Sequence, residues 1–144
     1  MQIDFYQLSR EPVERVLPSI AQRILESGGR LLVVADEARL EQISQGLWHA
    51  APETFLANGR AEGDHPDIQP ILLSQDCTAA NGARHIALAD GVWRDEALDF
   101  DRAFYFFDDD SIEGARASWR VLSKKEGVEP RFWRQEGRKW VKGP

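Results

Sequence analysis

The amino-acid sequence predicts a three-layer α/β fold, with a mostly parallel sheet flanked by helices on both faces. Residues 31–35 (LLVVA) form an apolar run that is typical of a strand buried on both faces, as in a parallel sheet, and residues 103–107 (AFYFF) predict a further strand. Segments with apolar residues at helical spacing lie between the predicted strands. We therefore expect a Rossmann-like or NTPase-like topology, and the length of 144 residues fits one domain over residues 1–144.

The first segments predict a strand followed by a helix. A short strand is expected over residues 3–8, where apolar and polar residues are mixed. Apolar residues then recur at steps of three and four between Pro12 and Gly28, which predicts a helix that begins near the proline and ends at the glycine. Pro18 lies within this pattern, so we expect it to kink the helix or to mark its true start.

The middle of the chain predicts a second helix, a loop and two more strands. Asp36 is placed to cap a helix that reaches Trp48. Residues 51–70 are rich in Gly, Pro, Asn and Asp, which predicts a long loop. Short apolar runs at 71–73 and 86–88 then predict strands.

The last part of the chain predicts a third helix and a final strand. Asp110 and Glu113 have the spacing of a capping box, and acidic residues suit a helix N-terminus electrostatically. The helix is expected over residues 111–126, with Gly127 as its stop. Residues 132–134 predict a final edge strand.

The turns after the first two predicted strands lack the glycines of phosphate-binding loops. These turns are residues 9–12 (SREP) and 35–38 (ADEA), and neither contains a P-loop or a dinucleotide motif. Asp108, Asp109 and Asp110 follow a predicted strand, so they could bind a divalent metal, but helix capping explains them as well. The alternative function that uses these aspartates is a degenerate nucleotide-binding enzyme.

The histidines and the cysteine indicate no catalytic or metal centre. His49, His65 and His85 show no metal-binding spacing, and no Gly-x-Ser-x-Gly motif is present. Cys77 is the single cysteine, which excludes an intrachain disulfide and a multi-thiolate metal site. No apolar run approaches the roughly 20 residues that span a bilayer, and the first residues lack a secretory pattern. We therefore predict no catalytic motif, no cofactor and no metal, and a cytoplasmic location.

Charge is divided unevenly along the chain. Residues 116–144 contain nine Lys and Arg against three Asp and Glu, a net charge of +6, whereas residues 1–115 carry −12. Three of the five tryptophans lie in the basic segment. Arginine beside aromatic surface favours an acidic, partly apolar partner, because guanidinium groups pair with carboxylates and stack on rings. The overall charge of −6 disfavours general DNA coating.

The predicted third helix combines an apolar stripe with a row of cations. The stripe consists of Ile112, Ala115, Trp119 and Leu122. Arg116 and Arg120 lie four residues apart and flank it, and Lys124 continues the row. This arrangement fits a receptor for a peptide that ends in a hydrophobic residue and a carboxylate. It equally fits a helix that packs Trp119 into the core while its basic edge is solvated.

Trp48 and Phe55 form a second aromatic pair, on either side of an Ala-Ala-Pro segment. Such residues either anchor a protein partner or cover the edge of the sheet, and both interpretations stay open.

Several segments, in their order and spacing, resemble the chi subunit of bacterial DNA polymerase III holoenzyme. They are residues 5–8 (FYQL), 47–49 (LWH), 52–56 (PETFL), Asn58, 63–66 (GDHP), 115–120 (ARASWR) and Gly127. The resemblance runs nearly from end to end. It implies an α/β fold that is related to nucleotide-binding domains but lacks their phosphate loop, and a non-enzymatic accessory role in DNA replication.

The resemblance also implies a tail-binding site. Chi subunits bind the acidic C-terminal tail of single-stranded DNA-binding protein, which ends in a Phe carboxylate, and so bridge that protein to the clamp loader. In this sequence the tail site maps onto Arg116, Trp119 and Arg120, with Lys124 as a weaker addition.

A second site, for the psi subunit, maps by resemblance onto Trp48 and Phe55. Psi subunits are not evident in every bacterial lineage, so a clamp-loader component is the alternative partner there. Residues 131–144 depart from the shorter chi C-termini as a basic, Trp-rich extension. This extension could lengthen the tail site or make weak contact with single-stranded DNA.

Overall fold

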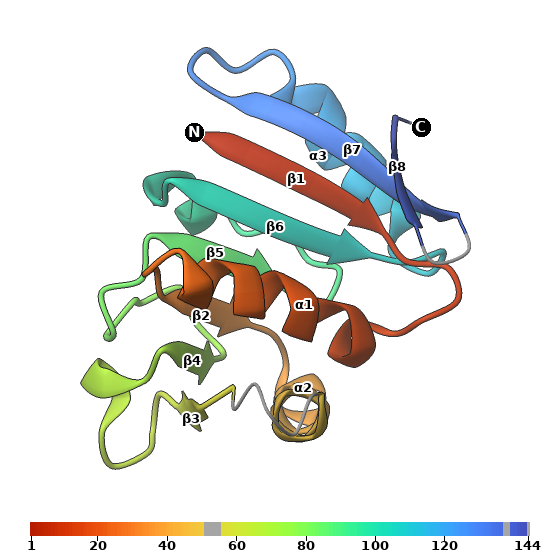
Figure 1. Ribbon diagram of the computed structural model, residues 1–144. Helices are drawn as coiled ribbons and strands as arrows, with labels where there is room; N and C mark the ends of the chain where they lie inside the picture. The colour runs from red at the N-terminus through yellow and green to blue at the C-terminus, as the bar shows by residue number, and fades with distance from the viewer. Residues whose placement is uncertain (51–55, 137–138, 144) are drawn as a thin grey trace.

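The structure, a computed structural model, describes residues 1–50, 56–136 and 139–143. Within these residues eight strands form one sheet in the order β3-β4-β2-β5-β6-β1-β7-β8 (Figure 1). Every neighbouring pair is parallel except β7 and β8, which are antiparallel. The predicted α/β class with a mostly parallel sheet is therefore confirmed.

The elements have the following bounds. The strands are β1 (Gln2–Gln7), β2 (Leu31–Val34), β3 (Asn58–Arg60), β4 (Ile71–Ser74), β5 (His85–Leu88), β6 (Arg102–Phe107), β7 (Glu129–Glu136) and β8 (Lys139–Lys142). The helices are α1 (Val13–Glu26), α2 (Glu37–His49) and α3 (Ile112–Leu122), with short 3₁₀ turns η1 (Pro66–Ile68) and η2 (Asp95–Asp99).

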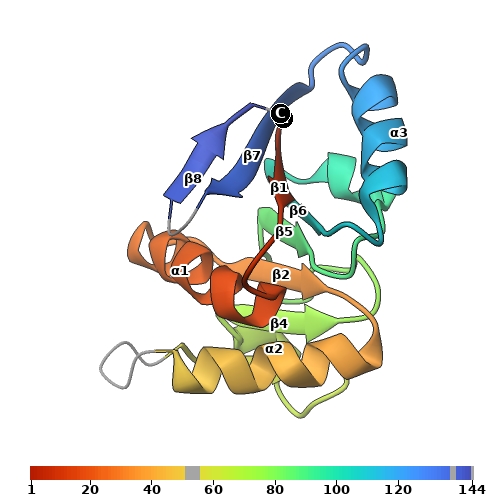
Figure 2. The ribbon, with the colours of Figure 1, turned by 90° about the vertical axis from the view of Figure 1, so that its right-hand side faces the viewer.

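The helices lie on both faces of the sheet. Figure 2 shows α1 and α2 on one face and α3 on the other, which gives the three predicted layers. The α1 and α2 helices pack closely where Gly46 meets the carbonyl of Glu14, and a Cβ at that position would clash with this oxygen. Glycine is therefore needed at Gly46 for the approach of the two helices.

The strands β2 and β6 occupy the interior of the sheet, as their apolar sequences predict. All four residues of β2 are fully buried, and five of the six residues of β6 are buried. Both faces of these two strands are covered by helices or loops. Alternate side chains of each strand therefore belong to two separate clusters of the core.

The structure decides both predicted helix starts in the first half of the chain. The Asp36 carboxylate accepts a hydrogen bond from the backbone N–H of Arg39 at 2.9 Å, so it caps α2 as predicted. The α1 helix begins directly after Pro12 and continues through Pro18, whose side chain is buried. Pro18 therefore does not mark the start of the helix.

The predicted capping box of α3 is wrong. The N-cap residue is Ser111, and the carboxylate of Asp108, not Asp110, accepts hydrogen bonds from the backbone N–H groups of Asp110 and Ser111 at 3.1 and 3.2 Å. The helix also ends at Leu122, four residues earlier than predicted. Gly127, with φ of 81°, lies in the turn that follows, where the left-handed backbone favours glycine.

The C-terminal part of the sheet also differs from the prediction. The strand predicted at 132–134 is the eight-residue β7, which lies between β1 and β8 and is therefore not an edge strand. The edge strand on this side of the sheet is β8, which the sequence did not predict. The predicted loop at 51–70 contains β3 and η1 in its described part.

In the described part of the chain, each helix is too short or too polar to cross a lipid bilayer.

Candidate functional site

A groove lies between α3 and the neighbouring strand β7, on the α3 face of the sheet. Its cavity measures about 540 Å³. Aromatic side chains of Trp119 and Phe132 form its apolar surface, and three guanidinium groups line it, those of Arg116, Arg120 and Arg134. We call this site the α3 groove.

Two elements distant in sequence position these side chains. On α3, Arg116, Trp119 and Arg120 are three and four residues apart, so they share one side of the helix. On β7, Phe132 and Arg134 are two residues apart, so they point to the same face of the sheet. The register of the parallel pair places Phe132 beside Phe5 of β1.

Trp119 contributes to the core and to the groove at once. Its ring packs edge-on against Phe5 at a centroid distance of 5.1 Å and against Phe132 at 5.8 Å. The side chain is nevertheless only half-buried, and it lines the cavity. The two interpretations of Trp119 left open by the sequence therefore both apply, because packing against the core fixes an indole that also faces the groove.

The cations of the α3 groove are not held inside the protein. Arg116 pairs with Glu113 at 3.0 Å, and both side chains are more than half exposed. Arg134 approaches Glu136 at 3.7 Å, and among the described residues no ion pair involves Arg120. Exposed pairs contribute about 0–1 kcal/mol, so a ligand carboxylate can replace them at little cost.

Three of the four predicted tail-site residues meet in this groove, and the fourth does not. Lys124 lies in the exposed turn beyond α3, outside the cavity lining. Arg134 was expected only as part of the extension 131–144 that could lengthen the tail site, and was not assigned to the site individually. The available signal was the two-residue spacing from Phe132 within a strand, but only the β1–β7 pairing brings that strand beside α3.

The second predicted site is described only in part. Trp48 is the penultimate residue of α2, with 46% of its surface exposed. Phe55 lies outside the described residues, so the structure does not place the pair together. Figure 2 shows α2, which contains Trp48, and α3 on opposite faces of the sheet.

The carboxyl edge of the sheet is where a Rossmann-like fold would bind a nucleotide. Here the chain leaves β1 toward one face and β6 toward the other, and a cavity of about 380 Å³ lies between the two loops. The carboxylate of Asp108 accepts hydrogen bonds from the backbone N–H groups of Asp110 and Ser111, in the turn before α3. Asp108 thus closes the turn that leads into α3.

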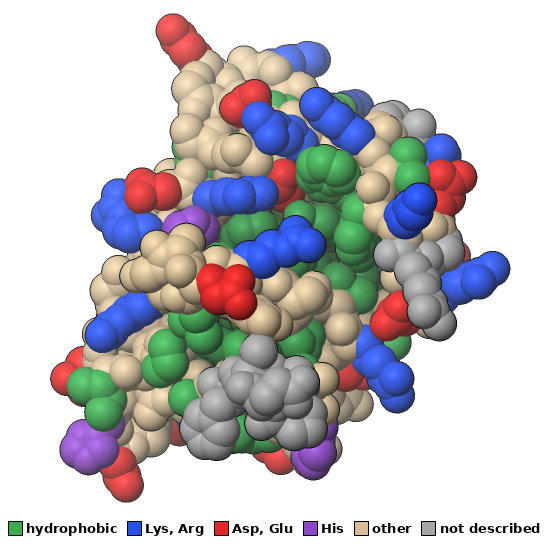
Figure 3. Space-filling model, in the orientation of Figure 1, with side chains coloured by type: hydrophobic (Ala, Val, Ile, Leu, Met, Phe, Trp, Pro, Cys, Tyr) green, Lys and Arg blue, Asp and Glu red, His purple; other side chains and the backbone are tan. Residues whose placement is uncertain are grey.

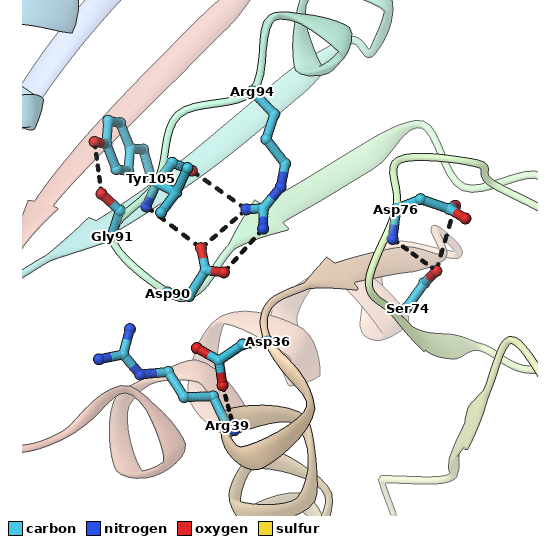
Figure 4. Close-up of polar contacts among 9 residues, drawn as sticks. Asp36, Arg39, Ser74, Asp76, Asp90, Gly91, Arg94 and Tyr105 are labelled. Carbon is cyan, nitrogen blue, oxygen red and sulfur yellow. Dashed lines mark hydrogen bonds and ion pairs between the residues drawn. The ribbon is translucent and has the colours of Figure 1, made fainter.

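Other carboxylates at this edge are likewise bonded within the protein (Figure 4). Asp90 forms two hydrogen bonds with Arg94, both 2.9 Å, and Asp36 caps α2. Burial on its own raises the pKa of Asp90, but hydrogen bonds and charge from Arg94 lower that pKa below its ordinary value overall. These contacts stabilise loops, and none of them favours the nucleotide-binding alternative.

The histidines and the cysteine are dispersed. Burial and the charge of Arg102 lower the pKa of His85, while His49 contacts the backbone oxygen of Gln45 at 2.7 Å. Burial, with help from Glu96, raises the pKa of the Cys77 thiol, which disfavours its reactive thiolate. In residues 1–50, 56–136 and 139–143, no group of three or more His, Cys, Asp or Glu side chains is arranged to hold a metal ion.

Comparison with protein families identifies the relatives of this chain. The model of the family described as "DNA polymerase III chi subunit, HolC" matches residues 1–131. The chain belongs to the chi subunit family. The match supports an accessory role in DNA replication within the polymerase complex. A search of curated proteins found no match.

The chi family match includes only part of the α3 groove. Arg116, Trp119 and Arg120 lie inside the matched residues, whereas Phe132 and Arg134 lie just beyond them. The basic, Trp-rich extension therefore completes the groove of this chi subunit with two of its own side chains.

Proposed function

We propose that this chi subunit is a non-catalytic bridge between the clamp loader and single-stranded DNA-binding protein. The acidic C-terminal tail of single-stranded DNA-binding protein binds in the α3 groove. This position follows from the family resemblance of residues 115–120. The observation that supports this proposal is the convergence of three guanidinium groups on one apolar cavity. Residues 1–144 act as a single chi domain in the cytoplasm, with 131–144 as its extension.

The groove offers partners for both groups at the end of such a tail, the carboxylate and the Phe ring. A terminal carboxylate forms charge-assisted hydrogen bonds with Arg116, each contributing about 1.5–3 kcal/mol. A terminal Phe ring that packs against Trp119 and Phe132 contributes about 1.5–3 kcal/mol more. Since micromolar affinity requires about 8 kcal/mol, these contacts predict weak, salt-sensitive binding that is strengthened when several tails are present.

Bridging needs a second surface, which we assign to the region of Trp48 and Phe55. Its partner is the psi subunit or a clamp-loader component. The exposure of Trp48, and the position of α2 on the face opposite α3, support simultaneous binding of the two partners. A tail in the α3 groove does not overlap α2.

The tail site is tested by calorimetry with a synthetic peptide of the tail. We expect Arg116→Ala to lower the affinity at least tenfold, because one charge-assisted bond is worth about that factor. The matched control is Lys125→Ala, which removes an exposed cation outside the groove and leaves the affinity within twofold. Trp48→Ala also leaves it unchanged.

A peptide without its terminal Phe provides the second arm of this experiment. It binds the unmodified protein as poorly as the complete peptide binds the Arg116→Ala variant. Equal affinities of the complete and the truncated peptide would refute the proposed recognition of the terminal Phe ring by Trp119 and Phe132.

A further inference from the structure

The strand β7 divides its side chains between the two faces of the sheet. Phe132 and Arg134 line the α3 groove, whereas Trp133 belongs to the core cluster of the opposite face. There it packs beside Tyr6 of β1 and Trp140 of β8. We call the surface formed by Tyr6, Trp133 and Trp140 the aromatic face.

The rings of the aromatic face are held in fixed positions. Trp133 lies nearly parallel to Tyr6, with an interplanar angle of 16° and a centroid distance of 6.4 Å, and Trp140 meets Tyr6 edge-on at 5.0 Å. The indole N–H of Trp133 donates to the buried carboxylate of Asp4 at 3.0 Å. Both tryptophans keep part of their surface exposed.

The aromatic face has no helix over it among the described residues. Figure 1 shows α1 crossing in front of β5 and β2, while β1, β7 and β8 lie open beside it. In the same orientation, Figure 3 shows hydrophobic side chains in a hollow above α1, with Lys and Arg side chains around them. The surface is therefore an accessible aromatic patch with a basic margin.

The residues of this margin come from four elements: Arg23, Arg102, Arg131 and Lys142. Lys142 is directly opposite Trp133 across the β7–β8 pair, and Arg131 pairs with Asp4 in the β1–β7 register. Arg102 bonds Asp4 at 2.7 Å, and its guanidinium also lies 4.7 Å from the ring centroid of Phe104. Arg23 is an exposed residue of α1; burial raises the pKa of Tyr6 to about 12, and the charge of Arg23 partly offsets that rise.

The acidic groups on this surface do not cancel the margin. Asp4 is fully buried and bonded to Arg102 and Trp133, and Glu129 pairs with Arg131 at 3.3 Å. The margin therefore keeps a net positive charge, although the chain as a whole carries −6.

We propose that the aromatic face binds single-stranded nucleic acid directly. Exposed indole surface offers stacking to unpaired bases of any type, and a basic margin pairs with the phosphates that connect them. A duplex fits less well, because its bases are already stacked on one another. The site is separate from the α3 groove, so the same basic segment contacts a protein tail on one face and the nucleic acid on the other.

The test uses fluorescence anisotropy of a labelled twelve-nucleotide thymidine oligomer with the full chain at low salt. The double variant Arg23→Glu, Lys142→Glu changes two exposed side chains and is expected to weaken binding at least tenfold. The matched control Arg15→Glu, Lys125→Glu makes the same change of net charge with exposed residues away from the aromatic face, and leaves binding within twofold.

Stacking is tested separately by Trp140→Ala and Trp140→Phe. The alanine variant weakens oligomer binding about fivefold or more, whereas the phenylalanine variant, which keeps a ring, retains most of it. Circular dichroism melting curves establish that each variant is folded. Tail peptide at saturating concentration does not displace the oligomer.

Three outcomes would overturn the proposal. The first is no binding of the oligomer by the unmodified chain at low salt. The second is an equal loss in the matched control or in Arg116→Glu, which would indicate general charge attraction or the α3 groove. The third is a combined result for the Arg23→Glu, Lys142→Glu variant: its affinity for the oligomer is unchanged, but it no longer binds a purified polymerase subunit. That result would make the aromatic face a protein-docking surface.

Discussion

At strands β1 and β7, the two faces of the sheet contain similar side chains but are covered differently. On one face α3 stands beside the strands, and the space between helix and sheet is the α3 groove. On the other face no described helix covers β7, and the rings of Tyr6, Trp133 and Trp140 pack on one another. The space beside α3 is a cavity, whereas the aromatic face lies open beside α1.

This difference shows how one basic, aromatic segment can serve two kinds of partner. Consecutive residues of a strand point to opposite faces, so Phe132 and Trp133 contribute to different surfaces although they are neighbours in the chain. A cavity lined by guanidinium groups suits a chain end, and exposed indole surface suits unpaired bases.

Each face also contains a buried carboxylate paired with an arginine. Removing the carboxylate is expected to lower the free energy of unfolding more on the aromatic face. Asp4→Ala leaves the indole N–H of Trp133 and the Arg102 guanidinium without their shared acceptor, so we expect a loss of about 3 kcal/mol in the free energy of unfolding. Urea denaturation measures this loss. Asp4→Asn, which keeps an acceptor oxygen, loses less.

The same variant separates the two faces. If they are independent, the folded Asp4→Ala protein binds the tail peptide within twofold of the unmodified protein. A large drop in tail affinity without unfolding would show that the α3 groove depends on the aromatic face.

The corresponding pair near the α3 side is Asp90 with Arg94. It supports the loop whose Gly91 carbonyl accepts a hydrogen bond from Tyr105 at 3.0 Å (Figure 4). Asp90→Asn is expected to cost about 2 kcal/mol in unfolding free energy at pH 7, because it removes a charged hydrogen-bond acceptor from Arg94.

The pH dependence of this loss follows from the lowered pKa of Asp90 in the folded protein. A carboxylate with a lowered folded-state pKa stabilises the fold above its unfolded pKa of about 3.9, and this contribution disappears as the pH falls through the folded value. The unmodified protein and Asp90→Asn should therefore converge in stability on acidification below about pH 4. A constant difference between pH 7 and pH 3 would contradict the assignment.

The sequence predicted those elements whose signals are local. Residues 31–35 and 103–107 are apolar without interruption because interior parallel strands are buried on both faces, and Asp36 caps α2 through the backbone of its own first turn. Arg116, Trp119 and Arg120 were predicted to share one side of a helix from their spacing alone, and the structure places them so.

The elements that the sequence missed depend on contacts between distant segments. The strand β7 mixes charged and aromatic residues because each of its faces is only partly covered, so it lacks the apolar pattern of an interior strand. β8 is defined by its pairing with β7. The capping box predicted at Asp110 is absent, because the chain turns around the Asp108 carboxylate and α3 starts one residue later, with Ser111 as its N-cap.

The smallest expected change in affinity tests most closely whether the two faces bind different ligands. Arg134 lines the α3 groove and Arg131, three residues earlier on β7, belongs to the aromatic face, so the two residues should act on different ligands. Arg134→Ala is expected to lower tail-peptide affinity about threefold, the modest effect of an exposed charge, and to leave oligomer affinity unchanged. Arg131→Ala should show the reverse pattern.

Calorimetry with the peptide and anisotropy with the oligomer, at matched salt, measure all four affinities. Equal losses of affinity for both ligands in both variants would mean that the two faces form one continuous basic surface.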